Sequence, residues 1–120
     1  MKKFRTGEHW RVGWNPNAAT FKALVGAEDW SVELTQAEFN DFVRMLRQLT
    51  EALEVASTEL MDEEAIAIDQ ETELIWMQLN GFPHEFSLSF MLLTGRRAEG
   101  HWNTSATQKF IQAIQTIQLF

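Results

Sequence analysis

Hydrophobic and polar residues alternate through much of the first 34 positions, and this period of two is typical of half-buried β-strands. Trp10, Val12 and Trp14 share one face of a strand predicted over residues 9–14, and Arg11 lies on the other face. The same pattern predicts strands over residues 21–25 and 30–34, with turns at residues 15–17 and 26–29. We therefore expect three or four strands in this part of the chain.

From Thr35 onward the period changes to that of an α-helix. Thr35 and Glu38 have the spacing of a capping box, in which each side chain bonds the backbone N–H of the other residue. Hydrophobic residues then recur every three or four positions from Phe39 to Leu53, which is the stripe of an amphipathic helix. The pattern predicts a helix that begins after Thr35 and ends near residue 57, with a charged, solvated outer face.

The alternation of strands returns near residue 65. We expect four strands, over residues 65–68, 74–80, 84–94 and a short segment that ends near residue 102. Turns are predicted at residues 69–73, 80–83 and 94–97, and the Asn-Gly pair in the second of them is a strong hairpin signal. A second amphipathic helix follows, with Ser105 as its predicted N-cap and Phe110, Ile114 and Ile117 in its apolar stripe.

Each half of the chain thus consists of strands followed by a capped helix. The segments GAEDW (residues 26–30) and AEGHW (residues 98–102) precede the two helices in the same way, which indicates a duplicated unit. We predict an α+β fold in a single domain over residues 1–120, with two β-sheet-plus-helix halves at about residues 1–62 and 63–120.

The charge of the chain is unevenly distributed. Its formal net charge is −7, but residues 1–27 have a net charge of +4, residues 28–73 of −12 and residues 74–120 of +1. An acidic protein is a poor match for a polyanion, yet the concentration of acid in one segment weakens that argument. No apolar run reaches the length of a membrane span, and the basic start is not followed by an apolar segment. We therefore expect a cytoplasmic protein without a membrane partner.

The residues that carry common chemistries are missing or scattered. The chain has no cysteine, which excludes disulfides, thiolate metal ligands and a thiol nucleophile. It also lacks a phosphate-binding loop, a Gly-x-Ser-x-Gly elbow and a His-Glu-x-x-His pair. His9, His84 and His101 do not have the spacing of metal ligands, and the acidic run at residues 62–64 is typical of a solvated linker. We expect no catalysis, no cofactor and no metal.

The aromatic residues have two interpretations. All five tryptophans fall on or beside predicted strands, where they fill a core or form a surface on which nucleic-acid bases stack. In the second interpretation cations meet phosphates and rings meet bases. The candidate nucleic-acid site then comprises Arg11, Lys22, Arg96 and Arg97 for the phosphates, and Trp10, Trp14 and Trp102 for the bases.

Several long motifs resemble a known family. They are WRVGWNP (residues 10–16), LVGAEDWSVELT (24–35), ELMDEE (59–64) and GRRAEGHW (95–102). Together they are similar to an uncharacterised domain family found mainly in cyanobacteria. The resemblance implies a fold shared with the Whirly proteins and the single-stranded-DNA-binding transcriptional coactivators, namely four strands and a helix, here repeated in tandem. Those DNA-binding relatives are basic on their binding sheet, whereas this chain is acidic overall.

Two functional hypotheses follow. In the first, the chain is a regulatory module that binds single-stranded nucleic acid through its sheets. In the second, it is a protein-interaction adaptor that uses the acidic helix face or an exposed aromatic patch. A small enzyme is a third and weaker alternative. If the halves are a duplication, each sheet and helix has its partner within the chain, and we expect a monomer or a weak dimer.

Overall fold

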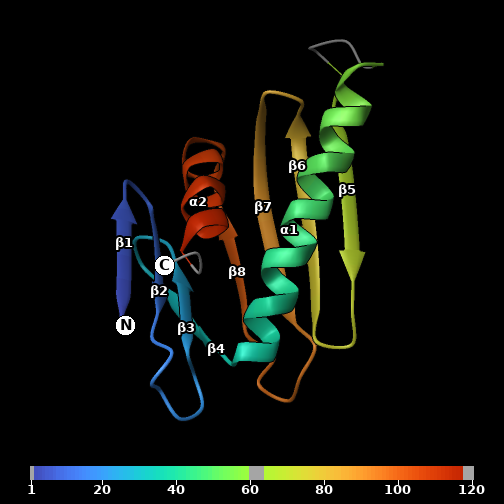
Figure 1. Cartoon of the computed structure of the whole chain (residues 1–120). Coiled ribbons are helices and arrows are strands. Elements are labelled where there is room, and N and C mark those ends of the chain that lie inside the picture. The colour runs from blue at the N-terminus through green and yellow to red at the C-terminus, as the bar shows by residue number, and fades with distance from the viewer. Residues whose placement is uncertain (1, 60–63, 118–120) are drawn as a thin grey trace.

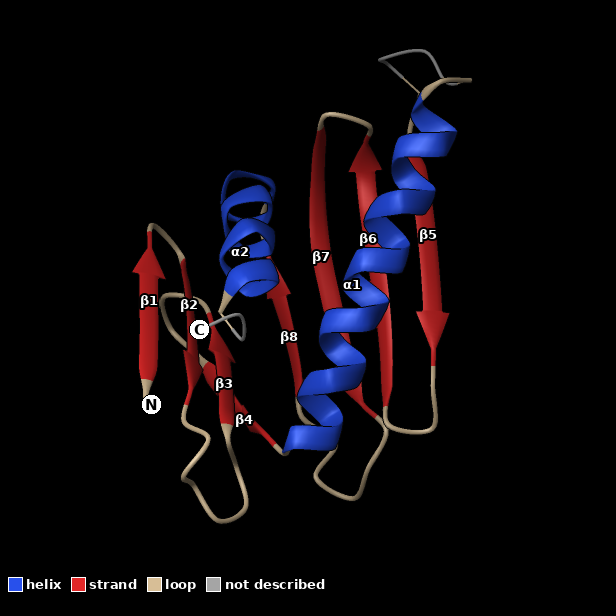
Figure 2. Cartoon of the chain, in the orientation of Figure 1, coloured by secondary structure: helices blue, strands red, loops and turns tan. Residues whose placement is uncertain are grey.

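The computed structural model describes residues 2–59 and 64–117. Within these residues the order is four strands, a helix, four strands and a second helix (Figures 1 and 2). The elements are β1 (Lys3–Gly7), β2 (Trp10–Trp14), β3 (Ala23–Gly26), β4 (Ser31–Leu34), α1 (Gln36–Ser57), β5 (Ile66–Glu71), β6 (Ile75–Phe82), β7 (Glu85–Leu92), β8 (Glu99–Trp102) and α2 (Thr104–Thr116). The α+β class and this order of strands and helices are confirmed.

The strands form two four-stranded antiparallel sheets, with the orders β1-β2-β3-β4 and β5-β6-β7-β8. Strand β4 of the first sheet lies beside β8 of the second, so the two sheets meet along this seam. Helix α1 crosses from the first sheet to lie over β5 and β6, and α2 lies over β7 and β2. Both helices are on one side of the sheets (Figure 1), which we call the helix side. The opposite side carries neither helix, and we call it the open face.

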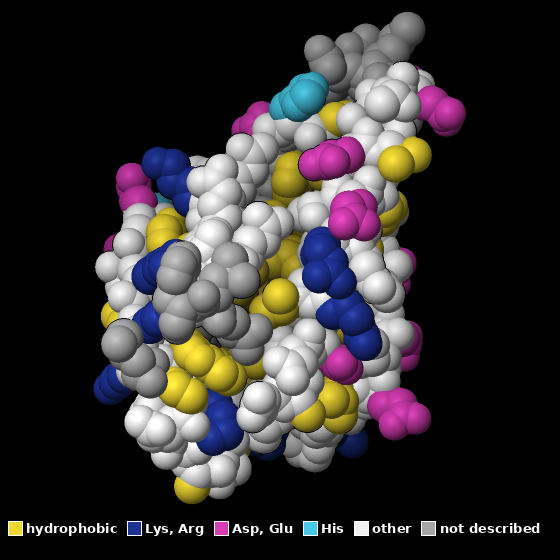
Figure 3. Space-filling model, in the orientation of Figure 1, with side chains coloured by type: hydrophobic (Ala, Val, Ile, Leu, Met, Phe, Trp, Pro, Cys, Tyr) yellow, Lys and Arg dark blue, Asp and Glu magenta, His cyan; other side chains and the backbone are white. Residues whose placement is uncertain are grey.

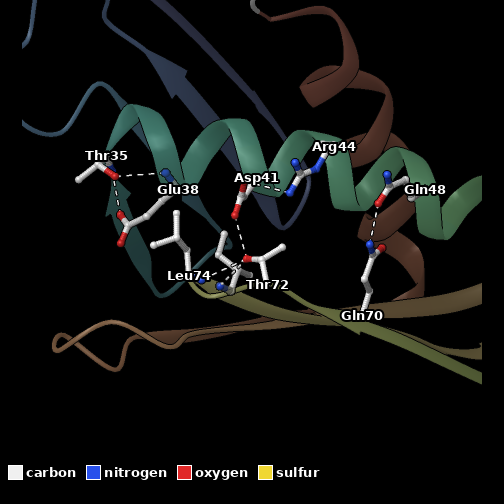
Figure 4. A network of polar contacts seen from close by, with 9 residues as sticks. Thr35, Glu38, Asp41, Arg44, Gln48, Gln70, Thr72 and Leu74 are labelled. Atoms are coloured by element: carbon white, nitrogen blue, oxygen red, sulfur yellow. Dashed lines mark hydrogen bonds and ion pairs between the residues drawn. The ribbon is translucent and has the colours of Figure 1, made fainter.

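Helix α1 forms as its sequence predicts. The Thr35 side chain accepts from the Glu38 N–H at 3.2 Å, and the Glu38 Oε1 accepts from the Thr35 N–H at 2.8 Å, so the capping box is confirmed. On another side of the helix, Asp41 accepts a hydrogen bond from Thr72 at 2.8 Å (Figure 4). Gln48 accepts another from Gln70 of β5 at 2.7 Å. These bonds fix α1 on the second sheet.

Helix α2 begins at a different cap from the predicted one. The Asn103 side chain accepts from the Ala106 N–H at 3.0 Å, and it is therefore the N-cap. The predicted cap, Ser105, lies inside the first turn and donates to the Asn103 Oδ1 at 2.8 Å. Asparagine and serine are about equally good caps, so residue type alone did not separate the two positions.

Three strand predictions need correction. Strand β1 was not predicted, because it is an edge strand in which Phe4 is the only large hydrophobic residue. Strand β5 continues to Glu71, through part of the turn expected at residues 69–73. Strand β6 passes straight through the Asn-Gly pair to Phe82, and the hairpin turns at residues 83–84 instead. Gly81 has a φ of 143° there, which few residues other than glycine adopt.

The two halves share one hydrophobic core. Trp30, next to β4, packs against Trp102 of β8 with ring centroids 5.0 Å apart, and against Phe90 of β7 at 6.1 Å. Phe42 of α1 lies edge-on to Trp102 and to Phe110 of α2, each with centroids 6.1 Å apart. These aromatic contacts join both sheets and both helices across the seam. The predicted boundary between the halves, at residues 62 and 63, lies outside the described residues.

Candidate binding surface

Two of the four cations assigned to phosphate binding are held by backbone carbonyls of this chain. Arg11 reaches the backbone carbonyls of Glu28 and Trp30, each at 3.4 Å. The Lys22 ammonium donates to two backbone carbonyls of its own loop, at residues 16 and 18, at 2.8 and 2.7 Å. Arg97 is exposed at the turn between β7 and β8 and makes no side-chain hydrogen bond with another described residue. Arg11 and Lys22 are therefore engaged in internal contacts.

Arg96 has a structural position. Its guanidinium donates to the Glu38 carboxylate at 2.5 Å and to the Glu33 carbonyl at 2.6 Å, and it lies over the Phe21 ring at 4.7 Å. Glu38 is only 4% exposed. Arg96 therefore ties the second half of the chain to the start of α1, and it is not available to a phosphate while these contacts hold.

The tryptophans assigned to base stacking face the helix side. Trp102 is 1% exposed, and its indole N–H donates to the Gly26 carbonyl at 2.8 Å, so it is a core residue and its assignment to base stacking is corrected. Trp14 stacks on Phe39 of α1 with centroids 5.5 Å apart. Trp10 is half-buried against the same core. Side chains alternate between faces along a strand, so Trp10 and Trp14 cannot share a face with Arg11.

The helix side carries its charges in separate areas. Figure 3 shows this side: Lys and Arg side chains lie along the margin at β1 and on the middle of α1, and acidic side chains gather toward the far end of α1. A groove of about 300 Å³ separates the helices, with walls that include Thr50, Glu54 and Gln112. Its apolar residues, such as Leu53 and Phe86, are buried in the floor. This groove therefore presents both polar and apolar groups to solvent.

More of the exposed large hydrophobic side chains lie on the open face than on the helix side. The described chain has five exposed large hydrophobic residues, which are Phe4, Val55, Phe82, Met91 and Leu93. Val55 belongs to α1. Phe4, Phe82 and Met91 lie on the open face, because each is out of phase with the buried residues of its sheet. Leu93 follows the end of β7. Phe4, 56% exposed, lies opposite Gly13 on β2.

Two neighbouring rows of side chains cross the open face of the second sheet. One row runs Glu71, Trp76, Met91, Glu99 from β5 to β8, and the next runs Asp69, Gln78, Ser89, His101. The Trp76 indole N–H donates to Asp69 Oδ2 at 3.0 Å, and Ser89 Oγ lies 2.9 Å from His101 Nδ1. Trp76, Met91, Glu99 and His101 line a hollow of about 370 Å³. We call this hollow, with Glu71 and Asp69 beside it, the Trp76 site.

The Trp76 site was not among the predicted site residues. A signal for it exists in the sequence: Ile75, Met77 and Leu79 occupy the buried phase of β6, whereas Trp76 shares the other phase with Gln78 and Asn80. A tryptophan in the polar phase of a strand is a large ring placed at a surface. Trp76 is therefore better placed to contact a binding partner than the tryptophans of the core.

The open face is acidic. Among the described strand residues it presents five carboxylates, from Glu33, Asp69, Glu71, Glu85 and Glu99. Arg11 is the one guanidinium that these strands add to it, and no lysine lies on them there. A surface of this charge repels phosphates and attracts cations.

No three His, Asp or Glu side chains in residues 2–59 and 64–117 are grouped so that they could hold a metal ion. Asp62 and Glu63 of the acidic run lie outside the described residues. Neither α1 nor α2, as described, is both long and apolar enough to cross a membrane.

The fold and the sequence can be compared with known proteins. The crystal structure of a protein with unknown function from the DUF155 family of Prochlorococcus sp. NATL2A is similar to this one, with a TM-score of 0.90 and 24% sequence identity. The similarity covers 96% of this chain and 98% of that chain, and at this identity it shows a common fold alone. No functionally curated protein matches the sequence. The family described as a domain of unknown function, DUF1818, matches residues 5–117, and the chain therefore belongs to the DUF1818 family.

Proposed function

We propose that this domain is a non-catalytic protein-interaction module that binds its partner through the open face. The observation that carries the proposal is the position of the exposed hydrophobic residues, three of five of which lie on that face. Exposed apolar side chains with a polar surround are typical of protein interfaces. The sheets provide a rigid support for such a surface, because the shared core and both helices lie behind them.

The nucleic-acid hypothesis is less well supported by the same geometry. It requires cations and aromatic rings on one surface. Here Arg11 and the rings of Trp10 and Trp14 lie on opposite sides of β2, and Arg96 is held by Glu38. The carboxylates of the open face also oppose a phosphate backbone. We therefore prefer a protein partner.

We further infer that the two halves descend from one duplicated unit of the Whirly type. Each half consists of four antiparallel strands followed by a helix that begins with a side-chain cap. Both helices also lie on the same side of the paired sheets. In this interpretation the open face of the pair is the surface that such a unit uses for binding.

Site-specific photo-crosslinking in the native cells tests the proposal. Benzoylphenylalanine is placed at Met91 or Phe4 on the open face, and at Val55 on α1 as a matched control that is also apolar and exposed. We expect protease-sensitive, nuclease-resistant adducts from the two open-face positions and none from Val55. A nuclease-sensitive adduct would favour the nucleic-acid hypothesis, and an adduct of twice the chain mass would indicate self-association. Equal adducts from all three positions would refute the choice of surface.

A further inference from the structure

The Trp76 site combines an aromatic ring with carboxylates in a fixed arrangement. Neighbouring strands are about 4.8 Å apart, so Glu71 is one strand spacing from Trp76, and Glu99 is two spacings away on the other side. The hydrogen bond to Asp69 holds the indole in one orientation. A group that lies over the ring therefore has a carboxylate of β5 on one side and a carboxylate of β8 on the other.

These carboxylates lack a cation of their own. Neither Glu71 nor Glu99 forms an ion pair with another described residue. The described strands of the second sheet place no lysine or arginine on the open face, and His101, bonded to Ser89, is the one group there that can become positive. Separated carboxylates around the half-buried Trp76 ring create a local negative potential that a cation from outside would relieve.

We propose that the Trp76 site receives an arginine or lysine side chain of the protein partner. The cation lies over the Trp76 ring, where the quadrupole of the indole attracts it, and Glu99 and Glu71 neutralise its charge. The alkyl part of the same side chain packs on Met91 at the wall of the hollow. This inference rests on the proposed function and adds to it the chemistry of the partner: a basic segment with apolar residues beside its cations.

The same charges disfavour two other occupants. A second copy that packed its open face on this one would bring two sets of carboxylates together, and a nucleic acid would bring phosphates to them. A basic protein segment matches both the sign of the charge and the exposed apolar residues.

A peptide titration followed by NMR tests the inference. The reporter is the Trp76 indole N–H resonance, which is assigned by comparison with a Trp76→Phe variant. Three peptides with the sequence acetyl-Gly-X-Leu-X-Gly-amide are compared, in which X is arginine, citrulline or glutamate. Citrulline has nearly the shape of arginine without its charge. We expect the arginine peptide to shift the Trp76 resonance saturably, the citrulline peptide to bind at least fivefold more weakly and the glutamate peptide not to bind.

Matched variants locate the charge effect. Changing Glu71 and Glu99 together to Gln should weaken binding of the arginine peptide about three- to twentyfold, which corresponds to two exposed ion pairs. Changing Glu33 and Glu85 to Gln removes the same charge from the same face but far from the hollow, and should change affinity less than about twofold because salt screens distant charges. All four side chains are exposed, so the variants are expected to fold.

The outcomes separate this inference from the proposed function. Equal binding of the arginine and citrulline peptides at Trp76 would overturn the basic partner and leave the open face as the interface. No shift of Trp76 with any peptide, together with protein adducts from Met91, would also overturn the inference while the proposed function stands. No adduct from the open face would remove the proposed function and this inference with it.

Discussion

Replacing Arg96 by alanine separates a structural role from a binding role. In the structure its guanidinium contacts the Glu38 carboxylate, the Glu33 carbonyl and the face of the Phe21 ring. In the same structure Glu38 is 4% exposed and also accepts hydrogen bonds from the Thr35 N–H and the Thr94 hydroxyl, at 2.8 and 3.3 Å. In Arg96→Ala this carboxylate loses its one charged partner at a position that is largely buried.

The loss of stability expected for Arg96→Ala lies between two known limits. Breaking a buried ion pair by removing one partner costs about 3–5 kcal/mol, and an exposed pair is worth about 0–1 kcal/mol. The side chain of Glu38 is 5% exposed and that of Arg96 is 35% exposed, so water reaches one partner only. We therefore expect Arg96→Ala to lower the free energy of unfolding by about 2–3 kcal/mol.

Urea denaturation followed by circular dichroism measures this change, and Arg97→Ala is the matched control. Arg97 is the neighbouring arginine, exposed and without a side-chain hydrogen bond to a described residue, so its loss should alter stability by less than about 0.5 kcal/mol. A Glu38→Gln change in the Arg96→Ala background should recover part of the loss, because it removes the uncompensated charge. If both arginine variants unfold at the parent's urea midpoint, the ion pair does not hold the halves together and the reasoning is wrong.

Three further predictions test the seam, the second cap and the assembly. A Cβ atom at Gly100 would lie 2.7 Å from the Phe90 ring and closer still to Trp30, so Gly100→Ala should lower the free energy of unfolding by about 1–3 kcal/mol, measured by urea denaturation. Gly95 has open space around it, so Gly95→Ala should be neutral or slightly stabilising in the same assay. Asn103→Ala should cost about 1 kcal/mol, measured in the same way, and Ser105→Ala should cost less, because Asn103 is the residue that caps α2. The chain should be a monomer by light scattering at micromolar concentration, because acidic open faces repel one another; an obligate dimer would contradict this.

The first helix was predictable from the sequence because its local signals agree with one another. Thr35 and Glu38 form the capping box, and the apolar stripe from Phe39 to Leu53 is the buried face. The strands with one buried face were also found, as for the buried series Phe86 to Leu92 in β7. These patterns survive because one face of each element packs on the core.

The errors arise where local signals are ambiguous or absent. Strand β1 is at a sheet edge, where Lys3 and Arg5 occupy positions that hydrophobic residues would have in a central strand. Its pairing is decided by β2 and not by its own composition. The Asn-Gly pair at residue 80 is compatible with a turn, but the longer register of β6 with β7 extends the strand through it. Tertiary pairing overrides the short-range preference in both cases.

The structure separates the residues of the predicted site for a geometric reason. Trp10, Arg11 and Trp14 are close together in the sequence, but alternation along the strand places the cation and the rings on opposite faces. Arg96 and Arg97 are adjacent, yet one is bound to Glu38 and the other is exposed. Sequence proximity in a strand therefore predicts a shared surface only for residues an even number of positions apart.

Strand alternation also decides which face carries each charge, and the resulting distribution is the reason for proposing a basic partner. Residues 1–27 have a net charge of +4, but β1 directs Lys3 and Arg5 to the helix side, β2 directs Arg11 to the open face, and Lys22 bonds its own loop. The basic segment thus never becomes a basic face. Four of the five carboxylates on the open face come from the second sheet, where each occupies the solvent phase of its strand. The sign of the potential at a surface is fixed by which phase of each strand carries the charge. Here that phase places carboxylates around Trp76, where we propose that a cationic side chain of the partner binds.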